Sequence, residues 1–456
     1  MKRFVKSSIA LFVWVLCLCS NTLSAKQHGF YKMRDAHSEY ILRKFVSPLF
    51  KTAGLDEKSL KPFIAPSRQF NAYATLDGTM VVFTEVILSL KNVEPLIGIL
   101  AHETGHIADR DITRNISNAL PKVGSIMLMG LAVGAAASAF TKSTELGLAS
   151  ILFTDRAATS TLNAHVLGIE ASADQRAYEL LKALNWPIHS LTSAMEYMLG
   201  HFGSGKTSSG ESIPVYLENH PLNADRVNFS KQKEVVQKGR HAKLPDDFKV
   251  QYSLLRGRVI GLLEPTQEIL ALEECGVEEL YAKALAYTRL QKKEEAIKYA
   301  DLLLKKTNND TYVRVAKSEI LANLGENRKA IKLLEEVVKV QKKDPLIWYE
   351  LAEIYSKLKE YKKAKHALLR VYYSGDDLKF SIEFWKLLIG AYDELGEKDE
   401  ATLARAELAV LQKEFDEGRE LIKTLRKNNK LSKPIEVKIK DLENQIEENE
   451  FKVGVL

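Results

Sequence analysis

The chain has 456 residues, of which 46% are hydrophobic and 27% are charged, and its formal net charge is +6 at pH 7. This length exceeds that of an ordinary single domain and predicts two or three domains, and the composition is typical of a soluble globular protein. Because the net charge is small for this length and no basic and aromatic binding module is present, the sequence indicates no nucleic-acid partner.

The first 25 residues have the pattern of an export signal. Residues 1–6 are basic, and residues 9–19 are apolar but too few to span a bilayer. Leu23 to Ala25 resembles a cleavage site, so we predict a signal peptide over residues 1–25, with an uncleaved anchor as the alternative. The remaining chain then contains one cysteine, Cys275, which excludes an intramolecular disulfide.

The next segment predicts a helix followed by a small sheet. Residues 34–49 have the pattern of an amphipathic helix, and residues 61–70 and 72–83 have that of strands. Asp77-Gly78 is a hairpin turn signal within the second of these stretches. Residues 84–90 predict a further short helix.

An H-E-x-x-H motif, His102 to His106, lies in the predicted helix 92–110. Residues four apart lie on one helix face, so His102 and His106 can bind the same metal ion. Zinc fits this pattern best, and Glu103 is placed to accept a proton from the water that such an ion activates. The alternative is a buried helix with two structural histidines. An extended substrate can also pair with a strand edge beside such a helix, although an ordinary sheet edge remains the alternative.

Residues 123–140 are uncharged and rich in small side chains. Their length just reaches that of a membrane span, but a single crossing would separate the metal-binding segments. Two interpretations remain: helices that pack near the site and dip into a membrane surface, or a buried core hairpin. An integral membrane protease that uses this stretch as a span is a third hypothesis.

A second helix, predicted over residues 168–184, carries Glu170 and Asp174 on one face. Glu170 is the predicted third metal ligand. Asp174, one turn further on, is suited to accept the free ring N–H of a ligating histidine. Ala171 and Ala173 allow this helix to lie close to the first.

His220 and Arg226 follow a glycine- and serine-rich loop. His220 would either take the fourth position on the metal or hydrogen-bond the reacting group, and Arg226 would neutralise the developing oxyanion. The alternative is an ordinary His-Pro turn.

Small residues recur at a regular period in the C-terminal part of the chain. Ala296, Ala330, Ala364 and Ala401 are spaced by 34, 34 and 37 residues. This period is typical of tetratricopeptide repeats, each of which is a pair of helices that touch at small residues. Stacked repeats form a concave surface, which predicts a protein- or peptide-binding role, with a solubilising scaffold as the alternative.

Four ordered motifs resemble the zinc metallopeptidase family that includes HtpX and the CAAX-prenyl endopeptidases: Asn71 to Ala74, His102 to His106, Glu170 to Asp174, and His220 to Arg226. The resemblance implies one zinc ion on His102, His106 and Glu170, with Glu103 as the base, Asp174 orienting a ligand, and Asn71 and Ala72 on the substrate strand. It also implies that His220 lies near zinc, where it either completes catalysis or plugs the site.

The export signal and the repeats make the chain similar to periplasmic members of that family. This similarity implies a periplasmic endopeptidase, with a possible outer-membrane association, that degrades stalled outer-membrane β-barrel precursors. It further implies a role in barrel assembly and contact with the assembly machinery. The alternative hypothesis is a non-enzymatic periplasmic chaperone or scaffold with a structural metal site.

The predicted fold is mainly α: a zincin-like metalloprotease domain of helices and a small β-sheet, followed by an α-solenoid of tetratricopeptide repeats. The predicted segments are the signal peptide over 1–25, the metallopeptidase domain over 26–250, a linker helix over 251–275 and the repeat domain over 276–456.

Overall fold

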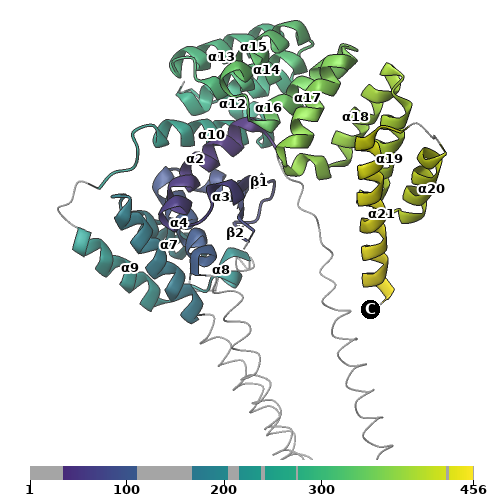
Figure 1. The fold of residues 1–456 in the computed structure, drawn as a ribbon. Coiled ribbons are helices and arrows are strands. Elements are labelled where there is room, and N and C mark those ends of the chain that lie inside the picture. Colours follow the sequence, from purple (N-terminus) through teal and green to yellow (C-terminus); the bar gives the residue numbers. More distant parts are fainter. Residues whose placement is uncertain are drawn as a thin grey trace, which may run out of the picture.

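The computed structural model describes residues 34–75, 77–109, 167–203, 215–237, 242–273, 276–427 and 431–454. Helices dominate these residues, and a small sheet lies in the N-terminal part (Figure 1), which confirms the predicted fold class. The predicted signal peptide and residues 123–140 lie outside the described residues. None of the described helices is both long enough and apolar enough to cross a membrane.

The N-terminal part packs helices around a three-stranded sheet. Its elements in chain order are α2 (Ala36–Thr52), η1 (Glu57–Ser59), β1 (Lys61–Ala65), β2 (Ala72–Ala74), β3 (Thr79–Phe83), α3 (Thr84–Ser89), α4 (Val93–Asp109), a helix over 167–183, α7 (His189–Phe202), α8 (Val215–Asn219) and α9 (Ala224–Gln237). The strand predicted over 61–70 ends at Ala65, because Pro66 has no backbone N–H to donate to a ladder.

The sheet has the strand order β1-β3-β2, with β1 parallel and β2 antiparallel to β3. The predicted hairpin joins β2 to β3, and Gly78 in its turn has φ +86°, a conformation that glycine adopts without strain. A Cβ on Gly78 would also lie 2.3 Å from the carbonyl oxygen of Ser59. The turn therefore requires glycine twice over, for its backbone angle and for its contact.

The C-terminal part is a row of antiparallel helix pairs, drawn in green and yellow in Figure 1. Its helices are α12 (Val277–Arg289), α13 (Lys293–Lys306), α14 (Thr311–Asn323), α15 (Asn327–Val340), α16 (Pro345–Lys357), α17 (Tyr361–Ser374), α18 (Ile382–Leu395), α19 (Lys398–Leu411), α20 (Phe415–Arg426) and α21 (Lys433–Gly454), with η2 (Asp377–Phe380) before α18. The recurring alanines 296, 330, 364 and 401 are fully buried, as expected of small residues where paired helices touch.

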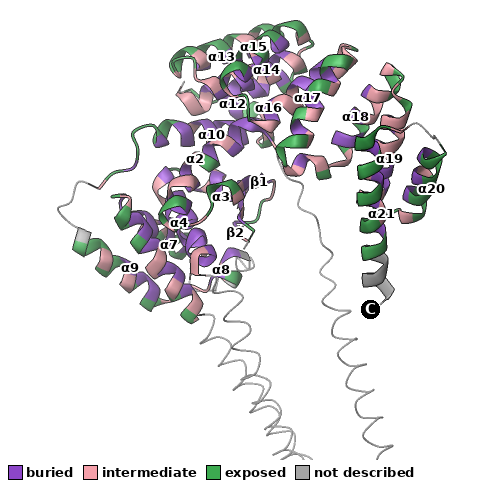
Figure 2. Cartoon of the chain, viewed as in Figure 1, coloured by how far each residue is buried: buried purple, intermediate pink, exposed green. Residues whose placement is uncertain are grey.

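Two helices occupy the segment predicted as one linker helix. α10 (Phe248–Leu263) and α11 (Thr266–Leu270) are separated by Pro265, which restricts the residue before it to extended backbone. α10 contributes buried side chains to an apolar core that also contains residues of α2, α4, α12 and α14. Figure 2 shows this continuous buried layer where α10 lies between the N-terminal part and the first repeats.

Polar contacts also join the two parts. Arg256 of α10 donates through Nη1 to the carbonyl oxygens of Ile87 (2.6 Å) and Leu90 (2.7 Å). The rings of Tyr40 in α2 and Tyr312 in α14 stack with centroids 3.9 Å apart. The repeats are thus joined to the N-terminal part through α10 and α14.

Candidate metal centre

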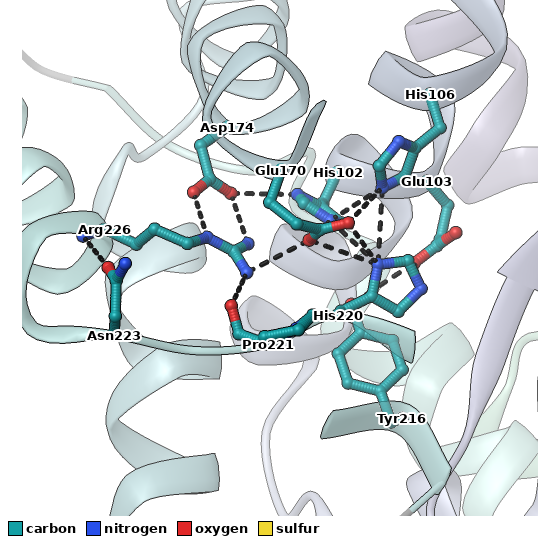
Figure 3. Close-up of polar contacts among 10 residues, drawn as sticks. All are labelled: His102, Glu103, His106, Glu170, Asp174, Tyr216, His220, Pro221, Asn223 and Arg226. Carbon is teal, nitrogen blue, oxygen red and sulfur yellow. Dashed lines mark hydrogen bonds and ion pairs between the residues drawn. The ribbon is translucent and has the colours of Figure 1, made fainter. Parts of the chain in front are cut away.

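Four buried side chains from three segments converge on one point. His102 and His106 extend from α4, Glu170 from the helix over 167–183, and His220 from the turn after α8 (Figure 3). Each offers one ligand atom, and these atoms lie within 4.8 Å of one another. The structure therefore brings together the two predicted histidine ligands, the predicted third ligand and His220.

The spacing of these atoms fits a small cation. Nε2 of His102 lies 3.0 Å from Nε2 of His106, 3.1 Å from Oε2 of Glu170 and 3.4 Å from Nδ1 of His220. Ligand atoms about 2.0–2.2 Å from a tetrahedral zinc ion lie roughly 3.3–3.6 Å apart. A ring nitrogen carries at most one proton, so hydrogen bonds alone cannot satisfy all of these contacts. Nitrogen and carboxylate donors in this arrangement suit zinc.

The two helices can bring these ligands together because small residues line their contact. A Cβ on Gly105 would lie 2.8 Å from the carbonyl oxygen of Ala173, closer than real Cβ contacts. Glycine at this position of the H-E-x-x-H motif lets the second helix approach closely enough for Glu170 to reach the histidines. The predicted close packing at Ala173 is therefore confirmed.

Acidic groups around His102 favour positive charge at the site. Oδ1 of Asp174 lies 2.9 Å from Nδ1 of His102. Burial opposes protonation of His102, but hydrogen bonds with Asp174 and Glu170 outweigh it and raise its pKa to about 10. Burial also opposes ionisation of Glu170, yet its hydrogen bonds with His102, His106 and His220 hold its pKa well below the usual value. Surroundings that favour an imidazolium also favour a metal cation.

Glu103 lies beside the cluster with 1% of its surface exposed. The hydroxyl of Tyr216 donates a hydrogen bond of 3.2 Å to Oε1 of Glu103, and the Tyr216 ring stacks on that of His220 at 4.6 Å. Sequence reasoning missed Tyr216. Its position four residues before His220, hence on the same face of a helical turn, was the available signal.

Arg226 contacts the acidic groups of the ligand helix. Its Nε and Nη2 donate to the two oxygens of Asp174 at 2.6 and 2.9 Å, and its Nη1 lies 3.0 Å from Oε2 of Glu170. Nη1 also donates to the carbonyl oxygen of Pro221 at 2.8 Å. The guanidinium therefore fixes Asp174 and Glu170, and its predicted action on an oxyanion stays a prediction.

His220 occupies the fourth donor position. Its Nδ1 lies 3.1 Å from Oε1 of Glu170, whereas its Nε2 lies 3.6 Å from Oε1 of Glu103. This geometry places the ring both in the cluster and beside the predicted base. The two predicted roles, in catalysis and in plugging the site, both stay predictions.

Asn71 and Ala72 lie at the start of β2, which is an edge strand in the described part of the sheet. Phe83 donates to the carbonyl of Asn71, and Thr75 donates to that of Thr79. By the alternation of antiparallel pairing, the backbone N–H and C=O groups of Ala72 point away from β3. Asn71 and Ala72 are buried as whole residues, with 5% and 0% of their surface exposed. The same alternation turns the backbone groups of Ala74 away from β3, and Ala74 is partly exposed.

Comparisons with known proteins agree with this site. The model of peptidase family M48 matches residues 37–234, and that of anaphase-promoting complex, cyclosome, subunit 3 matches residues 289–371. A protease HtpX homolog of Desulfatibacillum aliphaticivorans is 43% identical over 87 residues, which are 18% of this chain and 27% of the relative. A protease HtpX homolog of Campylobacter curvus (strain 525.92) is 28% identical over 211 residues, which are 41% of this chain and 72% of the relative.

Among solved structures, one described as "MamA RS-1 ArsTM double mutant" is similar to part of this chain. The match covers 37% of this chain and 94% of the chain in that structure. The identity is 22% and the TM-score is 0.28, a likeness too small to carry an argument.

Proposed function

Starting from the assignment of residues 37–234 to a metallopeptidase domain of family M48, followed by tetratricopeptide-like repeats, we propose that this chain is a zinc-dependent endopeptidase of the periplasm. Its proposed substrates are misassembled outer-membrane β-barrel proteins, and it also assists their assembly. The observation that carries the proposal is the convergence of His102, His106 and Glu170 with Glu103 alongside.

Each of these side chains has a task in peptide hydrolysis. A bound zinc ion supplies Lewis acidity, which polarises carbonyl groups and makes water more acidic. Glu103 accepts a proton at its carboxylate and later returns one to the leaving amine. Asp174, itself held by Arg226, fixes the ring of His102 so that Nε2 faces the ligand atoms of His106 and Glu170. Tyr216 holds the carboxylate of Glu103 in place through its hydroxyl.

The β2 edge supports binding of an extended substrate. The backbone groups of the partly exposed Ala74, which point away from β3, can pair with a peptide in extended conformation, and such pairing makes no demand on the side chains of the substrate. Unfolded or stalled precursors of β-rich proteins present such segments. A peptidase that recognises backbone rather than sequence suits a quality-control role.

The repeats support a recruiting role. Stacked helix pairs present an extended surface, and they are built onto the peptidase domain through α10. We propose that they bind substrates or the β-barrel assembly machinery. The pattern of residues 1–25 supports export to the periplasm, where peripheral contact with the outer membrane is part of the proposal.

One observation favours the second candidate, a non-enzymatic chaperone or scaffold. With His220 included, the site offers four protein donors, and a closed set of four ligands is typical of structural zinc sites. The presence of Glu103 beside the cluster opposes this alternative, because a purely structural site has no use for a buried carboxylate that is not a ligand.

The deciding experiment uses the purified full chain and the variant Glu103→Gln. We expect about one zinc per chain in both proteins, casein cleavage by the wild type, and a loss of roughly 10²–10⁴-fold in the variant, as for removal of a general base. The matched control is Glu179→Gln, an exposed carboxylate on the same helix as Glu170, which should leave cleavage unchanged. If Glu103→Gln binds zinc and retains every activity of the wild type, the scaffold hypothesis replaces the peptidase.

A further inference from the structure

A hollow of about 580 Å³ lies between the start of α16 and the outer part of α17. Its charged and aromatic walls, which we call the basic groove, are formed by Lys342, Lys343, Trp348, His366, Arg370 and Tyr373. The groove is far from the metal ligands in sequence, and nothing in the peptidase mechanism uses it.

The charge of the basic groove is uncompensated. Its walls include two lysines, an arginine and a histidine but no aspartate or glutamate. Other cations of the described repeats do pair with acids, as Lys365 does with Glu397 at 2.6 Å. Among the described residues, Lys342, Lys343 and Arg370 have no carboxylate within ion-pair distance. An anionic ligand would therefore find free cations here.

The aromatic walls are held in place and remain accessible. Nε1 of Trp348 donates to the carbonyl oxygen of Lys342 at 2.9 Å, and the guanidinium of Arg370 lies 5.5 Å from the centre of the Trp348 ring. Tyr373 is 78% exposed, which is unusual for so large an aromatic side chain. A ligand with both negative charge and apolar groups matches such walls better than a simple anion does.

Two further hollows share walls with the basic groove. One of about 250 Å³, between α17, α18, α19 and α21, shares Leu369 and Tyr373. The other, of about 230 Å³, shares Lys343 and Pro345 and reaches residues 61–63 of β1. Both neighbouring hollows contain carboxylates, whereas the basic groove contains none. Because the hollows share walls, a polypeptide bound in the basic groove can continue into either neighbour.

We propose that the basic groove binds an acidic, aromatic-containing segment of a partner polypeptide. The unpaired lysines and arginine bind the carboxylates of the segment, and Trp348 and Tyr373 pack against its apolar side chains. The two neighbouring hollows accommodate the partner chain on either side of the segment. A flat membrane surface fits a concave site between two helices poorly, and a small anion has no use for the aromatic walls. This inference rests on the binding role proposed above for the repeats and not on the peptidase activity.

The test measures fluorescence anisotropy of a labelled peptide, EEYGEEFGEE, with the full chain in a Glu103→Gln background, so that the peptide is not cleaved. We expect saturable binding that weakens as salt is raised, and no binding of the matched peptide KKYGKKFGKK. The combined substitution Lys342→Gln, Lys343→Gln and Arg370→Gln should weaken binding by roughly tenfold or more. The control carries Lys305→Gln, Lys332→Gln and Lys386→Gln, an equal charge change at exposed lysines outside the groove, and should bind as the parent does.

Two results would overturn the proposal. The first is an acidic peptide that does not bind, or that binds the groove variant as tightly as the control variant. The second is that the parent chain sediments with phosphatidylglycerol vesicles, the groove variant does not, and the acidic peptide binds neither protein. That result would assign the groove to a lipid surface. Either result leaves casein cleavage by the wild type, and hence the proposed peptidase, untouched.

Discussion

Asp174 faces His102 across the contact of two helices, with Oδ1 of the carboxylate 2.9 Å from Nδ1 of the ring. The carboxylate fixes which ring nitrogen of His102 is protonated. It so directs Nε2 toward the ligand atoms of the other three side chains in the cluster. Arg226 in turn holds both oxygens of Asp174. The orientation of His102, a proposed metal ligand, thus depends on Arg226, which contacts it only through Asp174.

The substitution Asp174→Asn should weaken zinc binding by roughly 10–100-fold, the usual cost of removing the partner of a histidine ligand. The asparagine preserves the size of the side chain but removes the charge that orients His102 and pairs with Arg226. Competition with a calibrated zinc chelator measures the effect. An unchanged affinity would show that Asp174 does not orient the ligand.

Gly105→Ala should damage both stability and the metal site, because the new Cβ would lie 2.8 Å from the backbone of Ala173. Overpacking of this kind costs about 1–3 kcal/mol, and any retreat of the second helix moves Glu170 away from the histidines. The matched control is Gly200→Ala in α7, where a Cβ meets nothing within 4 Å. Denaturant unfolding and zinc titration of both variants test this prediction, which fails if the two behave alike.

Removal of zinc should lower the midpoint of thermal unfolding. A ligand that binds only the folded chain stabilises it by about 4 kcal/mol when its concentration is 1,000 times its Kd. We expect the midpoint to fall on treatment with a chelator and to recover when zinc is returned. The variant His106→Ala lacks one of the proposed zinc-binding side chains, so its unfolding midpoint should change much less on addition of the chelator. A wild-type midpoint that stays the same with and without the chelator would contradict the metal site.

His37 should make stability depend on pH between about 6.5 and 4. Burial, reinforced by the nearby charge of Arg258, lowers the pKa of His37 from 6.5 to about 4. In this window the unfolded chain takes up a proton at His37 that the folded chain does not. The contribution of His37 to the free energy of unfolding is therefore present above pH 6.5 and falls as the pH falls toward 4. The loss is on the order of 3 kcal/mol at pH 4.

The measurement is urea unfolding at a series of pH values. His37→Phe keeps a ring between Tyr281 and Tyr312, on which His37 stacks, and should reduce the slope in this window. His201→Gln, at an exposed histidine, should preserve the slope of the wild type. Since loss of zinc also contributes at low pH, the difference between the two variants at equal zinc content is the quantity that tests His37.

The parts of the site that the sequence predicted are those governed by helix periodicity. His102 with His106, and Glu170 with Asp174, are each four residues apart on a helix, so local geometry places each pair on one face. The contacts of Tyr216 and Arg226 depend instead on how α8 and α9 return to the ligand helices. No local pattern specifies that path, and it decides that Arg226 meets Asp174.

The fold shows the same division. The repeat period predicted the helix pairs, because small residues must recur wherever two helices touch. The role of α10 was not predictable, because its side chains meet partners from both ends of the chain. A pattern of buried residues shows that a helix has an apolar face but not which elements cover that face.

The continuous core around α10 limits how this protein can be divided or recombined. A chain cut after residue 275 would lose Tyr281 and Leu285, which belong to the same buried cluster as Phe45 and Leu100 of the peptidase domain. The distal end has a cluster of its own around Ile422 and Ile439. Repeats at the far end can therefore be added, removed or exchanged without disturbing the core of the peptidase domain. The first repeats cannot be removed without exposing that core.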